Sequence, residues 1–104
     1  MVEEDTAVLP YRAQIEAILK QILREKKYRA YLFGSRATGI QSPTSDIDIA
    51  ILADKSPIDI ELSLAREALE DSTIPLLIEV IDLNQTSADF KAQVLQEGIL
   101  LWTS

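Results

Sequence analysis

Apolar residues recur along the chain with two different periods, and each period predicts a different kind of element. Between positions 10 and 27, apolar residues lie three or four positions apart with charged and amide residues between them, which predicts an amphipathic helix. Shorter runs rich in Ile, Leu, Val and Tyr predict strands. The predicted order is a helix at 10–27, a strand at 28–33, a short helix at 35–38, a strand at 46–53, a helix at about 57–71, a strand at 76–83, a helix at about 88–97 and a short strand at 99–102.

Residues that begin and end helices support these boundaries. Ser56 is the expected N-cap of the helix at 57–71, and Thr86 or Ser87 is the expected N-cap of the last helix, which Gly98 ends. Helices and strands alternate without repeats or a linker. We therefore expect one domain over residues 1–104 of the α/β (α+β) class, built as a layered sandwich.

The composition excludes several kinds of chemistry. Cysteine and histidine are both absent, so a thiolate zinc site, a cysteine nucleophile and a histidine base are excluded. The remaining oxygen ligands favour magnesium, manganese or calcium. A net charge of -7 disfavours direct binding of a nucleic acid. The acidic first residues and the lack of a long apolar run predict no signal peptide, no membrane span and a cytoplasmic location.

Asp46 and Asp48 stand two positions apart in a predicted strand, so their side chains should leave the same face of the sheet. Two carboxylates ~4 Å apart repel by about 4 kcal/mol at an effective dielectric constant of 20. A sheet rarely keeps such a pair for stability alone. A divalent cation between them would turn repulsion into ligation, whereas the alternative is an ordinary exposed strand face.

Gly34 and Ser35 follow the strand at 28–33, where a glycine and a hydroxyl suit a turn that approaches a phosphate. Arg36 is a further candidate for a phosphate contact or an exposed arginine. Ser45 lies in the following loop, where it could line a nucleotide pocket or cap a turn. A phosphate-binding turn followed by paired acids indicates metal-assisted chemistry on a nucleotide.

Glu79 and Asp82 are candidates for a third acid. They stand three positions apart on a predicted strand and therefore leave opposite faces. Two-metal phosphoryl transfer generally uses such a third carboxylate, and the sequence leaves open which of the two supplies it. The larger aromatic residues are interpreted as core or rim residues rather than as platforms for base stacking; they are Tyr28, Tyr31, Phe33, Phe90 and Trp102.

The segments 33–39, Phe-Gly-Ser-Arg-Ala-Thr-Gly, and 45–51, Ser-Asp-Ile-Asp-Ile-Ala-Ile, resemble the signature of minimal nucleotidyltransferases in the DNA polymerase beta superfamily. That signature is Gly-Ser, ten residues and then Asp-x-Asp, which this chain matches without adjustment. The resemblance continues through 79–83 and 98–101. It implies a nucleotidyltransferase fold, with a mixed sheet of about four strands, helices mainly on one face and an ATP-magnesium site on the other.

The resemblance also implies roles for individual residues. Gly34 and Ser35 would hold the triphosphate of ATP, and Asp46 and Asp48 would bind two Mg²⁺ ions. Glu79 aligns with the third acid, which binds the catalytic metal and helps to activate the acceptor hydroxyl. The family usually has aspartate at this position, so the longer Glu79 side chain puts turnover in question more than fold.

Small members of this family are often antitoxins whose partner is an all-helical HEPN-domain toxin, commonly a ribonuclease. The resemblance therefore implies transfer of AMP from ATP to a toxin tyrosine, and the acidic composition suits a protein partner. Homo- and hetero-oligomers both remain open. One alternative is a non-catalytic antitoxin that neutralises its partner by complex formation. A weaker alternative is a small-molecule nucleotidyltransferase, although such relatives carry an additional helical domain for the acceptor.

Overall fold

The computed structural model describes residues 9–34, 37, 46–55 and 57–104, and its elements alternate as the hydrophobic pattern predicts. None of the helices in these ranges is long and apolar enough to cross a membrane. In chain order the elements are α1 (Arg12–Ile22), β1 (Tyr28–Phe33), β2 (Ile47–Ala53), α3 (Asp59–Glu70), β3 (Ile78–Asp82), the 3-10 helix η1 (Leu83–Gln85), α4 (Ala88–Glu97) and β4 (Ile99–Thr103).

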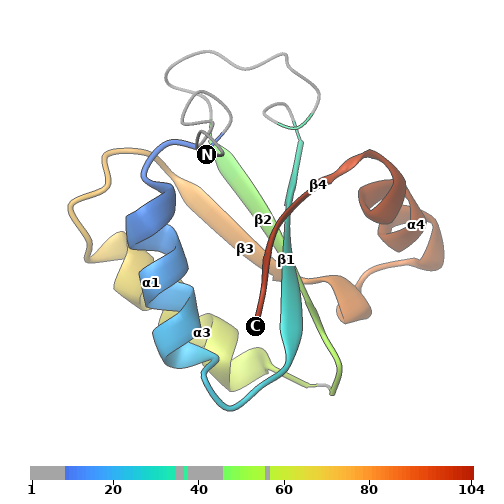
Figure 1. The fold of residues 1–104 in the computed structure, drawn as a ribbon, viewed down its shortest axis with the longest axis horizontal. Coiled ribbons are helices and arrows are strands. Elements are labelled where there is room, and N and C mark those ends of the chain that lie inside the picture. The colour runs from blue at the N-terminus through green and yellow to red at the C-terminus, as the bar shows by residue number, and fades with distance from the viewer. Residues whose placement is uncertain (1–8, 35–36, 38–45, 56) are drawn as a thin grey trace, which may run out of the picture.

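The strands form one mixed sheet in the order β3-β2-β1-β4. Strand β1 pairs antiparallel with both β2 and β4, whereas β2 and β3 run parallel and are joined through α3. Helices α1 and α3 cover one face of the sheet, and α4 lies on the other side (Figure 1). The predicted mixed sheet of about four strands, with helices mainly on one face, is confirmed.

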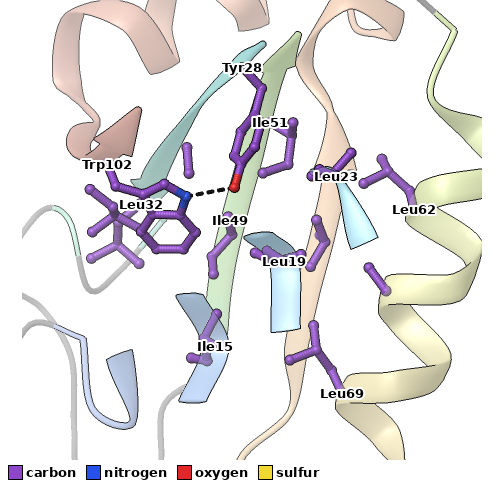
Figure 2. Close-up of a cluster of buried hydrophobic side chains, with 14 of the residues drawn as sticks. Ile15, Leu19, Leu23, Tyr28, Leu32, Ile49, Ile51, Leu62, Leu69 and Trp102 are labelled. Carbon is purple, nitrogen blue, oxygen red and sulfur yellow. Dashed lines mark hydrogen bonds between the residues drawn. The ribbon is translucent and has the colours of Figure 1, made fainter. Parts of the chain in front are cut away.

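The larger part of the core lies between the sheet and helices α1 and α3. Ile49 and Ile51 of β2 are fully buried, because alternate residues of a strand point to the same face. They pack in one cluster with Leu19 of α1 and Leu62 of α3 (Figure 2). Burial of such side chains contributes about 1.5–3 kcal/mol each, so this layer holds the sheet rigid beneath the opposite face.

A smaller apolar cluster covers the α4 side of the sheet. Tyr31 and Ala50 are buried there against Val94 of α4. The rings of Phe33 and Phe90 meet edge to face, with centroids 5.6 Å apart. Residues two apart on a strand share a face, so Asp48 lies on the same side of β2 as Ala50.

Two predicted helix boundaries are wrong for physical reasons. Helix α1 ends before position 27, because Leu23 turns into the core and the Lys27 carbonyl accepts a 2.8 Å hydrogen bond from the Asp54 amide. This bond extends the pairing of β1 with β2. Helix α3 takes Ile58 as its N-cap, with no side-chain capping bond. Ile58 is fully buried, so its packing fixes the helix start; the expected cap Ser56 lies outside the described residues.

Candidate active site

Asp48 lies near the start of β2, half-buried on the α4 side of the sheet. Its neighbours across the sheet are Phe33 of β1 and Glu79 of β3, and Asp46 is exposed immediately before β2. Burial raises the pKa of the Asp48 carboxyl group above its usual value, and the negative charges of Glu79 and Asp46 raise it further. The carboxylates of Glu79 and Asp46 thus lie close enough to disfavour ionisation of Asp48.

Gly34 makes the closest approach to this acid. Its φ of 80° lies in the region that glycine adopts at little cost. A Cβ atom at this position would stand 2.5 Å from Oδ2 of Asp48, well inside van der Waals contact. The Ala37 amide donates a 3.1 Å hydrogen bond to the Gly34 carbonyl, so the chain turns tightly after β1. The predicted turn and the predicted acid are therefore neighbours in space.

The register of β2 and β3 shows which of the two acids on β3 lies beside Asp48. Glu79 is the direct partner of Asp48, so the two side chains share a face. Asp82 is the partner of Ile51 and is buried on the opposite face. Its Oδ1 accepts a 3.0 Å hydrogen bond from the amide of Asn84, which begins η1. Asp82 therefore has a structural position, away from the paired acids.

Ser35, Arg36 and Ser45 lie outside the described residues. Their predicted contacts with the nucleotide stay predictions. Of the predicted short helix after β1, only Ala37 is described, and it has a helical conformation.

The carboxylates of Asp46, Asp48 and Glu79 carry oxygen atoms, the ligand type that a hard cation such as Mg²⁺ prefers. Within the described ranges, no group of three or more His, Cys, Asp and Glu side chains is positioned to hold a metal ion, so the metal ligands stay a prediction. The raised pKa of Asp48 shows that burial and the neighbouring carboxylates of Glu79 and Asp46 disfavour its charged form. The absence of a side chain at Gly34 lets the Asp48 carboxylate lie against the backbone of the turn.

A pocket beside these residues was missed in the sequence. It has a volume of about 300 Å³ and is lined by Phe33 and Gly34 together with Phe90 and Gln93 of α4. The sequence carries no local signal for it, because the position of α4 against the end of β1 depends on the tertiary fold. Phe33 and Phe90 pack against the smaller buried cluster, in agreement with their interpretation as core or rim residues.

Comparison with known families and proteins gives consistent matches. Residues 13–104 match the family model described as polymerase beta, nucleotidyltransferase. The probable protein adenylyltransferase MntA of Haemophilus influenzae is 33% identical over 88 residues, which are 82% of this chain and 76% of that protein. The protein adenylyltransferase MntA of Shewanella oneidensis is 37% identical over 75 residues, which are 69% of this chain. The match spans 51%, about half, of that relative's length.

A solved structure is similar over most of the chain. One chain in the structure of tri-AMPylated Shewanella oneidensis HEPN toxin in complex with MNT antitoxin matches with a TM-score of 0.60 and 28% identity. The match covers 89% of this chain and 73% of that chain.

Proposed function

The chain belongs to the polymerase beta nucleotidyltransferase family, and on that premise we propose that it is an antitoxin that transfers AMP from ATP to a tyrosine of a HEPN-type toxin. The names of its MntA relatives support the reaction, and the AMPylated toxin in the related complex supports the partner. The observation that carries the proposal is that Gly34 lies directly against the Asp48 carboxylate, and that Glu79 is the neighbour of Asp48 on β3. We place the reaction in the cytoplasm.

We assign each candidate residue a role in this reaction. Gly34, with Ser35, Arg36 and Ser45, would hold the triphosphate, because a glycine turn lets backbone amides approach phosphate oxygens. Asp46 and Asp48 would hold two Mg²⁺ ions, which neutralise the phosphates and favour attack on the α-phosphorus when bound. Glu79 of β3 would complete the ligand set of one ion.

Glu79 lies on the side of Asp48 that faces away from β1, so the acceptor is expected there. The tyrosine oxygen forms a bond to the α-phosphorus, and the bond from that phosphorus to the oxygen bridging to the β-phosphate breaks. Pyrophosphate leaves with the bonding electrons. The phenolic proton passes to the Glu79 carboxylate, which is exposed and can reach an incoming side chain.

The test compares Asp48→Asn and Glu79→Gln with Asp82→Asn, a matched removal of charge on the opposite face of the sheet. Each variant is incubated with labelled ATP, Mg²⁺ and the co-encoded helical partner. We expect AMP transfer to fall by at least about 100-fold in the first two variants. Asp82→Asn should stay within about twofold of wild type once a thermal melt has shown that it folds. Equal labelling by wild type and Asp48→Asn would contradict the proposal.

A non-catalytic antitoxin is the second candidate, and Glu79 in place of the usual aspartate favours it, since the longer side chain has more rotamers to fix. Growth of cells that express the toxin separates the two functions. A catalytic antitoxin loses protection in Asp48→Asn while the complex still forms. A binding antitoxin protects equally well with Asp48→Asn, and then no AMP appears on the toxin.

A further inference from the structure

Strand β3 forms one edge of the sheet, and Arg66 of α3 holds the open side of its backbone. The Leu77 carbonyl turns toward β2, where it accepts a 2.9 Å hydrogen bond from the Ile47 amide. Carbonyls alternate in direction along an extended chain, so the Val80 carbonyl points away from β2. There it accepts two hydrogen bonds from the Arg66 guanidinium, from Nε at 3.1 Å and from Nη2 at 2.7 Å. Arg66 thus supplies donors that a further strand would otherwise supply.

The carbonyl that Arg66 binds directly follows Glu79, the acid that lies beside Asp48. The Val80 side chain is buried in the larger core and holds the same backbone from that side of the sheet. The Glu79 side chain leaves the opposite face and is exposed. Glutamate has one more rotatable bond to order than aspartate, so the position of its carboxylate depends strongly on a fixed backbone. At the open edge of β3, Arg66 is the residue that fixes it.

Arg66 and Glu79 also line one groove along this edge. The groove has a volume of about 590 Å³, and its other lining residues come from α3 and from the chain between 74 and 81. It lies on the side of Asp48 where the acceptor is expected. Two roles are therefore open to Arg66: it can hold β3, or it can touch the acceptor itself. The bonds to Val80 favour the first role, because two of the guanidinium nitrogens are already engaged on the backbone.

We propose that Arg66 is a positioning residue that keeps the Glu79 carboxylate beside Asp48 by holding the open edge of β3; the proposal rests on the function proposed above. Arginine suits this role, because its planar guanidinium presents donors in a fixed geometry, whereas the lysine ammonium group is a mobile point charge. A displacement of about 1 Å can lower the rate of a reaction by about 100-fold. Loss of Arg66 should therefore slow AMP transfer without weakening the binding of ATP or of the partner.

The kinetic test compares Arg66→Ala with Arg24→Ala, a matched loss of an exposed arginine that lies just after α1. We expect kcat for AMP transfer to fall by at least about tenfold in Arg66→Ala, with KM for ATP and for the partner within about twofold of wild type. Arg24→Ala should leave all three constants unchanged. Arg66→Lys keeps the charge and one donor group, so its loss of kcat should be intermediate, and it replaces Arg66→Ala if that variant does not fold.

A double-mutant cycle with Glu79→Gln separates positioning from a general loss of structure. In the Glu79→Gln background, Arg66→Ala should lower kcat by less than about twofold, because the carboxylate that Arg66 positions is already gone. Hydrogen exchange of the free protein gives a second measurement that does not depend on activity. The β3 amides should exchange at least about tenfold faster in Arg66→Ala and at the wild-type rate in Arg24→Ala.

Four results would overturn the proposal: an unchanged kcat in Arg66→Ala, the full loss of kcat in both backgrounds of the cycle, unchanged exchange of the β3 amides, or a raised KM for the partner alone. The last result would make Arg66 a docking residue for the acceptor. If wild type transfers AMP normally, each of these results leaves the proposed function standing. Wild type that transfers no AMP removes both proposals.

Discussion

At the scale of single residues, Gly34 and Asp48 restrict each other closely. The positive φ of Gly34 and the 2.5 Å separation between its missing Cβ and Oδ2 of Asp48 are independent reasons for glycine. The positive φ would strain the backbone of any other residue, and the short separation would bring any Cβ atom into the Asp48 carboxylate. A side chain at position 34 would therefore disturb both the turn and the acid proposed to hold the metal.

Gly34→Ala should reduce kcat/KM for AMP transfer by at least about 100-fold, because a displacement near 1 Å at a reacting centre has effects of that size. It should lower the free energy of unfolding by about 1–2 kcal/mol through the left-handed backbone alone. A double-mutant cycle with Asp48→Ala separates the two causes. The steric part of the destabilisation should vanish in the double variant, while the backbone part remains. Full additivity in chemical denaturation would show that the carboxylate does not constrain position 34.

The positions of these residues could be predicted from the sequence only in part. Spacing in a predicted strand at 46–53 singled out Asp46 and Asp48, but β2 begins at Ile47, so strand geometry fixes the face of Asp48 alone. Spacing also placed Glu79 and Asp82 on opposite faces. It could not say which acid lies beside Asp48, because that depends on the register of β3 against β2. A shift of one residue would have turned Asp82, and not Glu79, to the face of Asp48.

At the scale of elements, the hydrophobic period predicted which helices and strands form. It did not predict where the helices end or which strands pair. The four strands lie where apolar runs predicted them, since each has a buried face. The pairing of β4 with β1 could not be predicted from the sequence, because it joins segments that are distant along the chain. Helix α1 ended early for a related reason: the chain after it contributes to the pairing of β1 with β2.

Strand β4 is held to β1 by contacts that converge on Tyr28. The Ser104 amide donates to the Tyr28 carbonyl at 3.0 Å, and the Tyr28 amide donates to Oγ of Ser104 at 2.8 Å. The indole N–H of Trp102 donates to the Tyr28 hydroxyl at 2.9 Å within the core (Figure 2). This last bond can be removed by deleting one atom, the hydroxyl oxygen of Tyr28.

Tyr28→Phe should lower the free energy of unfolding by about 1–3 kcal/mol, because it leaves the buried indole N–H of Trp102 without its acceptor. Chemical denaturation measures the change. Tyr11→Phe is the matched control, since Tyr11 is 41% exposed, and it should change stability by less than about 0.5 kcal/mol. An equal effect of both substitutions would mean that the hydroxyl of Tyr28 adds nothing to the attachment of β4.

At the scale of the whole molecule, the two faces of the sheet differ. One face carries most of the core under α1 and α3, and the other carries Asp48, Glu79 and the pocket beside Gly34. The chain as a whole has a net charge of -7, so its acids repel one another in general. For Asp48 there is also a local effect: burial and the charges of Glu79 and Asp46 all raise its pKa and disfavour its charged form.

This arrangement predicts that the site reduces stability when no cation is present. The pKa of Asp48 is raised on folding, so its stabilising contribution is present below the unfolded pKa and is lost as pH rises through the folded pKa. At neutral pH the charged carboxylate therefore opposes folding. Asp48→Asn should melt a few degrees higher than wild type in a chelator, and Mg²⁺ should raise the Tm of wild type but not of the variant.

Glu67→Gln controls for net charge, because it removes one exposed charge from α3 on the opposite side of the sheet. Scanning calorimetry of the three proteins at neutral pH, with and without Mg²⁺, separates the local effect from the general one. A gain for Glu67→Gln as large as that for Asp48→Asn would mean that overall charge, and not the acid cluster, limits stability. A larger gain for Asp48→Asn, together with loss of AMP transfer, would mean that one carboxylate lowers stability and supports catalysis at the same position.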